Sequence, residues 1–461
     1  MSRRTQLTRP NGIATNYGYD SVSHLLSVLH QAGTTTLDGA GYTYDAAGNR
    51  LSKTNYLNGV TSNYGYDLLY ELTQVTQGGS TTESYSYDAV GNRLSSSGVP
   101  NYSYNSSNEL TWSSSGSYTY DANGNTLTDA QGRTFTWDFE NRLTQAVVPG
   151  SNGGTTTFKY DPFGRRIQKS GPLGTTNYLY DWGDVGADVI EEVDNSGSTL
   201  ARYTQGIDID QPYAEFRSGT IGYYQGDALN SITSVTNAAA AVDNTYVYDS
   251  YGNTMQSSGS LPNHIGYTAR EFDAETGLLY NRLRFYDPNL GRFVNEDPSG
   301  LGGSMNFYAY VNNSPISNVD PLGLAICTYF ASSGWLWCFP QQAGHDAVII
   351  RVASGNNGGA SDLPCKNNHK CDPLHDTGPI PRGWWIWTTG HTGKKNGRVL
   401  IPGPGTYDWG RDLIRSHSCA NPFSNSTPYC SGGCITGKPG DIKDLNKLID
   451  SEPGSKVFST D

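Results

Sequence analysis

The first 324 residues of the chain contain no cysteine, and all seven cysteines lie after them. Methionine is scarce, with three residues, and no run of apolar residues approaches the 18 or so that a membrane-spanning helix needs. The start, Met1-Ser-Arg-Arg, is basic, but no apolar segment follows it, so the sequence shows no signal peptide. These absences leave no basis for a transmembrane helix. The uneven distribution of cysteines along the chain indicates two units with different roles.

Basic residues are also few. Residues 1–324 hold 18 Lys and Arg against 32 Asp and Glu, a net charge of −14, whereas residues 325–461 hold 13 against 11, a net charge of +2. An acidic body argues against nucleic acid as its partner, so we expect no nucleic-acid partner. Only 36% of residues are hydrophobic and 55 are glycine, which favours many short strands joined by turns and predicts a mostly β fold.

A repeated pattern fills the N-terminal part: aromatic-x-Tyr-Asp, a Gly or Asn turn, then often Arg-Leu, as in YTYDAAGNRL (42–51) and YSYDAVGNRL (85–94). The period-two alternation predicts a strand, and Asp-x-x-Gly-Asn predicts a turn, so each unit reads as a β-hairpin. One hairpin cannot bury its face, and stacked hairpins form a coiling sheet. Residues 183–245 look like degenerate repeats without a catalytic constellation. The aromatic residues suit packing better than ligand binding.

The segment from Tyr280 to Leu324 separates the two parts: YNRLRFYDPNLGRF, then EDP, then NFYAYVNNSPISNVDPLGL. It resembles the core segment of Rhs/YD-repeat polymorphic toxins, and with the repeats the resemblance covers nearly all of residues 11–324. It implies a partial cage of YD-repeat hairpins over 1–265, a core segment over 266–324 and a C-terminal toxin domain over 325–461. A repeat is already under way by Asn11 and family members are usually far longer, so we expect the chain to be a truncated or separately encoded C-terminal piece.

The resemblance also implies self-cleavage between Leu324 and Ala325, with Arg284, Asp297 and Asp320 as the machinery. Two carboxylates that approach each other share a proton, so one can act as a base while the other acts as an acid. An arginine beside them can bind a carboxylate or a developing oxyanion. Spacing alone favours a simpler reading, in which Asp-Pro marks turns; the resemblance favours the cleavage site.

The cysteines of residues 325–461 indicate an oxidising destination. Their close spacings suggest the disulfides Cys327–Cys338, Cys365–Cys371 and Cys419–Cys430, one of 15 connectivities for these six residues. Cys434 would then be unpaired.

His417 at the end of an apolar strand, followed by Ser431-Gly-Gly433-Cys434-Ile, resembles the active-site signature of L,D-transpeptidases, although Ser418 and Thr436 depart from that pattern. The resemblance implies a small β-rich domain with a C-terminal helix, for which residues 441–450 have helical spacing. Cys434 would be the nucleophile and His417 its base, with the backbone around Gly433 as oxyanion hole. The expected partners are peptidoglycan stem peptides, a cognate immunity protein and a secretion-system component.

This reading makes the chain a secreted effector without cofactors or a resident metal, acting as a cysteine L,D-carboxypeptidase or transpeptidase in the periplasm of a target bacterium. Two alternatives stay open. The chain could be a cell-surface glycan-binding protein with a disulfide-stapled tail, in which Cys434 is structural. The tail could also be a zinc hydrolase, because Cys365, His369, Cys371 and His375 suit the metal, although their spacing matches no common zinc site.

Overall fold

The computed structural model describes residues 4–21, 23–151, 153–181, 188–206, 209–298 and 306–323, and after these only the backbone of eight strands between 327 and 460. The described residues form two compact units, and each is described by itself. In these residues the structure is almost entirely β, with two one-turn 3-10 segments, η1 (Tyr267–Ala269) and η3 (Val311–Asn313). The prediction of a mostly β fold with a hairpin shell is confirmed.

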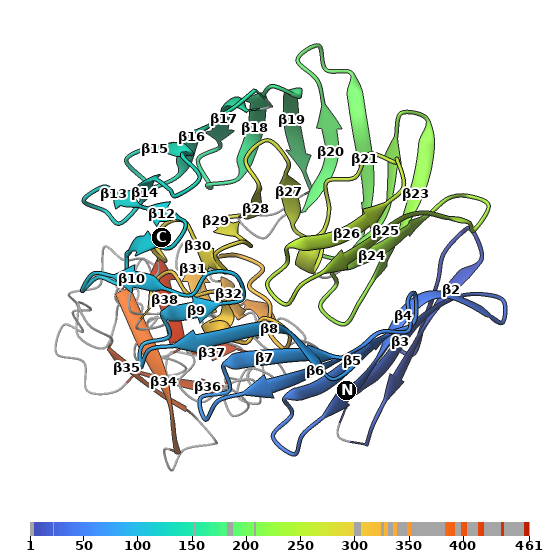
Figure 1. Ribbon diagram of the computed structural model, residues 1–461, viewed down its shortest axis with the longest axis horizontal. Helices are drawn as coiled ribbons and strands as arrows, with labels where there is room; N and C mark the ends of the chain where they lie inside the picture. Colours follow the sequence, from blue (N-terminus) through green and yellow to red (C-terminus); the bar gives the residue numbers. More distant parts are fainter. Residues whose placement is uncertain are drawn as a thin grey trace, which may run out of the picture. The chain divides into compact units, whose positions relative to one another are not determined.

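The first unit is a series of antiparallel sheets, and within each sheet every strand pairs with the next one along the chain (Figure 1). The first sheet contains β1 (Gln6–Thr8), β2 (Ile13–Tyr19), β3 (Leu25–Ala32), β4 (Thr35–Tyr44), β5 (Arg50–Asn55), β6 (Thr61–Tyr66), β7 (Leu72–Gln77), β8 (Ser80–Tyr87) and β9 (Arg93–Ser96). A short sheet follows, with β10 (Tyr102–Tyr104), β11 (Leu110–Ser113) and β12 (Gly116–Ser117).

A sheet of 14 strands comes next. It contains β13 (Thr119–Tyr120), β14 (Thr126–Thr128), β15 (Thr134–Trp137), β16 (Leu143–Val148), β17 (Gly154–Tyr160), β18 (Arg166–Gly171), β19 (Gly174–Tyr180), β20 (Val189–Val193), β21 (Thr199–Gln205), β22 (Pro212–Arg217), β23 (Thr220–Gly226), β24 (Ile232–Thr236), β25 (Val242–Tyr248) and β26 (Thr254–Ser258). The core segment adds β27 (Glu271–Asp273), β28 (Leu278–Asn281), β29 (Arg284–Asp287) and β30 (Arg292–Phe293).

The repeated Tyr-Asp pair explains why the hairpins form and stack. In one repeat, Asp88 Oδ1 accepts the backbone N–H groups of Val90 and Asn92, both at 2.9 Å, which fixes the turn. Tyr87 Oη donates to the carbonyl of Leu72 on the preceding hairpin at 2.8 Å. The same bond recurs from the tyrosines at the ends of β4, β6, β10, β17, β19 and β25. These tyrosines are therefore packing and bridging residues, as the sequence favoured.

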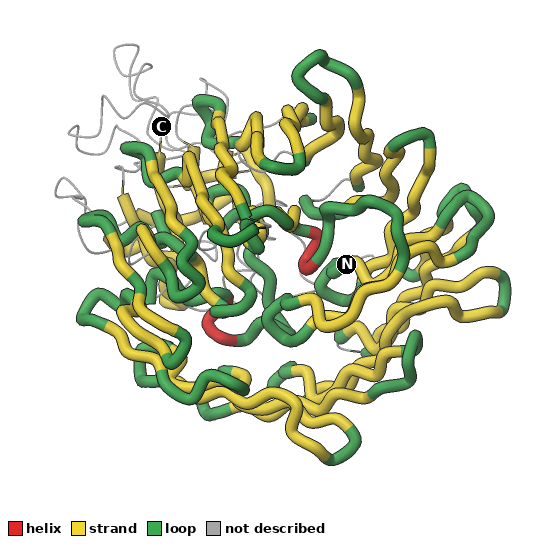
Figure 2. The backbone as a smooth tube through the Cα atoms, turned by 45° about the horizontal axis from the view of Figure 1, so that its top comes forward, coloured by secondary structure: helices red, strands yellow, loops and turns green. Residues whose placement is uncertain are grey.

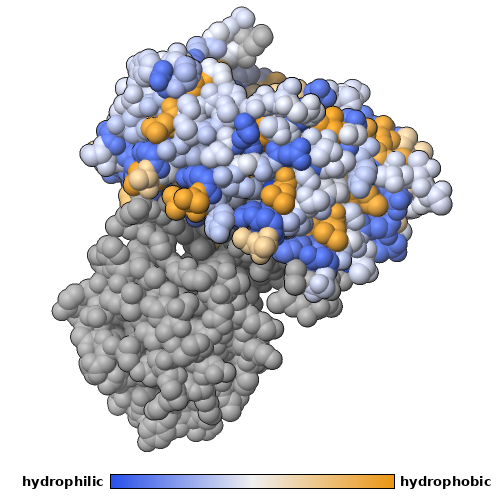
Figure 3. Space-filling view, turned by 60° about the horizontal axis from the view of Figure 1, so that its bottom comes forward, coloured by the Kyte–Doolittle hydropathy of each residue, from blue (hydrophilic) through white to orange (hydrophobic). Residues whose placement is uncertain are grey.

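A register shift precedes most of these tyrosines, for example between Ser86 and Tyr87 on β8. An extra residue on one strand bends it and increases its twist. Because the shift recurs with each repeat, the strands follow a curved path, which Figure 2 shows as a succession of hairpins around the core segment. On the face seen in Figure 3, the apolar side chains lie in separate small groups. Some of the exposed apolar residues, such as Phe139 and Phe163, lie at hairpin turns.

The first strands contact the last repeats through buried polar groups. Asp38 on β4 is 1% exposed and accepts hydrogen bonds from Thr233 Oγ1 at 2.5 Å and Ser234 Oγ at 2.7 Å on β24. His30 on β3 lies 3.1 Å from the carbonyl oxygen of Gly226, so its Nε2 donates. We call these contacts the seam; through them the two ends of the repeat series meet, which the sequence did not reveal.

Acid should weaken the seam. Burial lowers the pKa of His30 to about 4 from 6.5, with Asp38 opposing and Arg9 adding to the shift. A depressed histidine pKa supplies stability that is present above pH 6.5 and lost as the pH falls towards 4, up to about 3 kcal/mol. We expect thermal unfolding of wild type to show a steeper loss of melting temperature between pH 7 and pH 4 than that of His30→Gln. Equal pH dependence in the two proteins would contradict the assignment.

The second unit contains one sheet with strand order β33-β32-β31-β38-β34-β35-β36-β37. The strands are β31 (Cys327–Phe330), β32 (Trp335–Cys338), β33 (Val348–Arg351), β34 (Gly383–His391), β35 (Arg398–Pro402), β36 (Ile414–Ser418), β37 (Ile435–Gly437) and β38 (Lys456–Thr460). The helix predicted at 441–450 lies outside the described residues. No helix in the described part of the chain is long and apolar enough to cross a membrane.

Candidate functional site

The core segment brings together three of the residues predicted for cleavage. Arg284 opens β29, Asp297 follows β30 after three residues, and Asp320 lies three residues before Gly323. Arg284 Nη2 lies 3.0 Å from Asp297 Oδ2 and 3.2 Å from Asp320 Oδ2, so one nitrogen bridges two carboxylates that are 23 positions apart in the sequence. All three side chains are buried.

The other donors of Arg284 fix its position. Its Nε donates to the carbonyl of Gly323 at 2.7 Å, and its Nη1 donates to the carbonyl of Phe307 at 2.9 Å. The guanidinium carbon lies 3.4 Å from the centre of the Phe293 ring, a cation–π contact. The guanidinium charge is held by the Phe293 ring and by four oxygen atoms, so it is pre-organised to bind anionic groups at this point.

Gly323 makes the close approach possible. Its φ is +67°, a left-handed conformation that favours glycine. A Cβ atom there would lie 2.6 Å from the carbonyl oxygen of Asn281 and 3.1 Å from the backbone nitrogen of Arg284. The glycine of the DPLG sequence is therefore required by space and by backbone conformation.

The residues expected at the bond itself, Leu324 and Ala325, lie outside the described residues. The chain is described up to Gly323, one residue before that bond. The structure thus places the two carboxylates and the arginine around the chain that leads directly into it.

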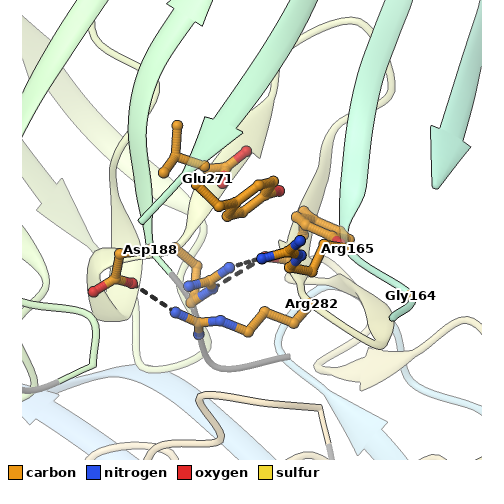
Figure 4. A pocket seen from close by; sticks show the side chains of 9 residues that line it. Gly164, Arg165, Asp188, Glu271 and Arg282 are labelled. Carbon is orange, nitrogen blue, oxygen red and sulfur yellow. Dashed lines mark hydrogen bonds and ion pairs between the residues drawn. The ribbon is translucent and has the colours of Figure 1, made fainter. Parts of the chain in front are cut away.

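A second charged group lies beside this site. Arg282 Nη2 contacts Asp188 Oδ1 at 2.7 Å and Asp210 Oδ1 at 2.8 Å, and Arg270 Nη1 also binds Asp210. Figure 4 shows Asp188 and Arg282 joined at the edge of a small cavity of about 20 Å³, which is room for about one water molecule. Burial raises the pKa of Asp188 to about 6, although Arg282 opposes the shift.

The sequence did not single out Asp188, Asp210, Arg270 and Arg282. The two aspartates fall in residues 183–245, which seemed to offer no constellation, and Arg282 is part of the YNRLRFYDP motif but was given no role. Its place two positions before Arg284 in that motif was the available signal. No sequence pattern links it to aspartates more than 70 residues away.

The residues predicted for the tail are only partly described. Ser431, Gly433 and Cys434 lie outside the described residues, as do Cys365, Cys371, Cys419 and Cys430. His417 is on β36, where it pairs with Thr436 on the parallel strand β37. Cys327 and Cys338 stand opposite each other on β31 and β32. The pairing in disulfides stays a prediction.

Comparisons with known proteins match the first unit. The family model described as the teneurin YD-shell matches residues 54–316. The tRNA3(Ser)-specific nuclease WapA of Bacillus spizizenii is 35% identical over 312 residues, 66% of this chain and 12% of the relative. The probable deoxyribonuclease RhsA of Dickeya dadantii is 30% identical over 235 residues, 49% of this chain and 16% of the relative.

Two further comparisons also match YD-repeat or toxin proteins. The double-stranded DNA deaminase toxin A of Burkholderia cenocepacia is 31% identical over 220 residues, 41% of this chain and 15% of the relative. A crystal structure of TcdB2–TccC3 superposes with a TM-score of 0.58 at 20% identity, over 70% of this chain and 19% of that one, which shows the shared fold. The chain thus spans less than a fifth of the length of each of these proteins.

These relatives correct the predicted activity. They are named as nucleases and a DNA deaminase, so the prediction of a cysteine L,D-transpeptidase or L,D-carboxypeptidase is wrong, as is the prediction of peptidoglycan stem peptides as partner. The exclusion of nucleic acid is contradicted as well. It rested on the charge of the acidic first unit, which says little about what a separate C-terminal unit binds. The His417 and Cys434 pattern is short, and a cysteine-rich domain can contain it by chance.

The comparisons do not support the two alternative functions either. None of these three relatives is named as a glycan-binding protein or as a zinc hydrolase. What the comparisons show is a YD-repeat shell.

Proposed function

The chain belongs to the teneurin YD-shell family, and on that basis we propose that it is an Rhs/YD-repeat toxin whose core segment cuts the chain after Leu324 and releases residues 325–461. The observation that carries the proposal is the bridge from Arg284 Nη2 to Asp297 and Asp320, made next to the carbonyl of Gly323. Asp-Pro turns alone would not require three segments of the core to converge on this point.

The chemistry is hydrolysis of one peptide bond. A water attacks the carbonyl carbon of Leu324 and gives its proton to one of the two aspartates, while the other aspartate, in its acid form, protonates the nitrogen of Ala325 as the C–N bond breaks. The products are a carboxylate on Leu324 and an amine on Ala325. Arg284 would hold the two carboxylates in place and offset the negative charge that develops.

The test is the state of the freshly made chain. We expect two bands on a denaturing gel and an N-terminal fragment whose mass ends at Leu324, because both carboxylates are present. Asp297→Asn and Asp320→Asn should each give a single full-length band, since an amide can replace neither the base nor the acid.

Glu296→Gln is the matched control. It makes the same chemical change one residue away, on a partly exposed side chain, and should be cut like wild type. A wild-type chain that stays full length, or an Asp297→Asn chain that is cut, would refute the proposal.

For the released part we propose an enzyme that acts on nucleic acid. The names of the nuclease and deaminase relatives support this class, and a net charge of +2 for residues 325–461, against −14 for residues 1–324, is compatible with it. As an effector of this type, the chain would be exported from the cell that makes it. Action in the envelope of a target bacterium was predicted because peptidoglycan was the expected substrate. Without that substrate, the prediction has no support.

The substrate class can be tested with the full chain. Purified protein is incubated with tRNA, double-stranded DNA and single-stranded DNA, and the products are examined on gels and by sequencing, which detects base changes as well as strand breaks. Change in at least one substrate is expected. If all three stay intact after incubation with folded, cleaved protein, the substrate class is wrong while the cleavage proposal stands.

A further inference from the structure

Four consecutive residues of the core hairpin bind four consecutive carbonyl groups of the chain that leads into the cleavage site. Asn281 Nδ2 donates to Asp320 at 3.0 Å, and Arg282 Nη1 donates to Pro321 at 2.5 Å. The backbone N–H of Leu283 donates to Leu322 at 3.2 Å, and Arg284 Nε donates to Gly323 at 2.7 Å. The donors and acceptors match one to one, without a gap, across 39 positions of sequence.

We infer that residues 281–284 are a register clamp, which fixes the peptide bond that enters the cleavage site, and that Asp210 of the repeat shell holds this clamp in place. The inference rests on the proposed cleavage after Leu324. It assigns positioning roles to Asn281, Arg282 and Asp210, which act through residues 320 and 321 and through each other.

The hairpin presents these donors because of its tight turn. Asn281 pairs with Arg284 at the ends of β28 and β29, so Arg282 and Leu283 form a two-residue loop. Arg282 has a φ of +52°, a left-handed conformation that is uncommon for a residue with a long side chain. Uncommon backbone of this kind persists where its surroundings impose it, and it gathers at functional sites.

The repeat shell supplies those surroundings. Arg282 makes two contacts with Asp210, from Nη2 to Oδ1 at 2.8 Å and from Nη1 to Oδ2 at 3.2 Å. Arg270 binds the same aspartate, and Asp188 binds Arg282 Nη2 at 2.7 Å. Two arginines are thus balanced by two aspartates that lie next to β20 and β22 of the shell. This two-point contact suits the planar guanidinium and leaves the second N–H of Nη1 for the carbonyl of Pro321.

Shape and hydrogen bonding specify the same register. If the segment slipped by one residue, Leu322 or Leu324 would occupy the place of Gly323. A Cβ atom at that place would lie 2.6 Å from the carbonyl oxygen of Asn281, closer than such atoms approach. Slippage therefore meets a clash as well as the loss of the matched donors, and the bond one residue after Gly323 is the one presented.

The first experiment follows cleavage with time after cell-free synthesis of the full chain, with the mass of the N-terminal fragment as readout. Arg282→Gln and Asp210→Asn should slow cleavage by about 100-fold, the order expected when a reacting group is displaced by about 1 Å. They should also yield some fragments that end at residues other than Leu324. Arg165→Gln is the control, because Arg165 lines the same cavity but pairs with Asp161 of its own repeat.

Wild-type rates with a single end at Leu324 in both Arg282→Gln and Asp210→Asn would overturn the clamp. A merely structural role would lower the melting temperature of the shell without altering the position of the cut, so both are measured. A shifted or mixed end in a shell that melts like the Arg165→Gln control supports the clamp.

The second experiment tests the clamp by a measurement that does not require self-cleavage. In Asp297→Asn chains, thermolysin is added briefly and cuts at Leu322 and Leu324 are quantified by mass spectrometry. The clamp predicts that adding Arg282→Gln raises these cuts at least several-fold, whereas adding Arg165→Gln does not. Equal cutting in the two double variants would overturn the clamp. Failure of wild type to cut itself would refute only the proposed function, since this second readout does not depend on it.

Discussion

Replacing Arg166 by methionine is expected to lower the free energy of unfolding of the first unit by about 3–5 kcal/mol, the cost of removing one partner from a buried ion pair. Arg166 begins β18 and is 0% exposed. Its Nη1 lies 2.5 Å from Asp273 Oδ2, and its Nη2 lies 2.5 Å from Glu271 Oε2. The guanidinium carbon also lies 4.2 Å from the centre of the Tyr280 ring. One side chain thus joins a repeat hairpin to the core segment.

The cost arises from what the substitution leaves behind. Burial alone would raise the pKa of Asp273, but Arg166, with help from Lys169, holds it below its ordinary value. Without the arginine, a buried carboxylate loses its main counter-charge and must take up a proton or admit water. Urea unfolding of Arg166→Met against wild type, followed by tyrosine and tryptophan fluorescence, measures the loss.

Arg202→Met is the matched control. Arg202 pairs with Glu191 at 3.0 Å, but its side chain is 64% exposed, so its removal should cost at most about 1 kcal/mol. If the two substitutions shift the urea midpoint equally, the buried network does not carry the stability assigned to it.

The hairpins could be predicted because their causes are local. The Asp of each repeat binds backbone N–H groups two and four residues on, so Asp-x-x-Gly-Asn specifies a turn wherever it occurs. The cleavage residues were predicted by a different route. Arg284, Asp297 and Asp320 were named from a family resemblance, and the structure brings them together through a hairpin and two turns of the core segment.

The seam and the contact between Asp210 and the clamp could not be predicted, since both depend on curvature that accumulates over many repeats. Asp38 meets Thr233 across 195 positions, and Asp210 meets Arg282 across 72. No period or motif relates such residues, and the stretch that holds Asp210 shows the repeat pattern only in degenerate form. The predicted activity was wrong for a different reason. It rested on a few residues around Cys434 rather than on the relationship of the shell to proteins named as a nuclease and a deaminase.

Replacing Arg284 by lysine is expected to slow the proposed cleavage after Leu324 by about 100- to 1,000-fold, the effect typical of losing a group that stabilises a developing oxyanion. Lysine keeps the charge but has a single nitrogen at the end of its chain. It cannot bridge Asp297 and Asp320 while also binding the carbonyls of Gly323 and Phe307, which Arg284 does with three separate nitrogens.

The measurement is the rate at which full-length chain disappears after cell-free synthesis, with the melting temperature of the first unit as a check on folding. Arg292→Lys is the control, because Arg292 is a buried arginine of the same segment that donates to the carbonyl of Asn108 at 2.7 Å and stacks 4.6 Å from the ring of Tyr308. It should be cut at close to the wild-type rate. If Arg284→Lys is also cut at that rate, charge alone suffices at this position, and the bridging geometry has no part in the reaction.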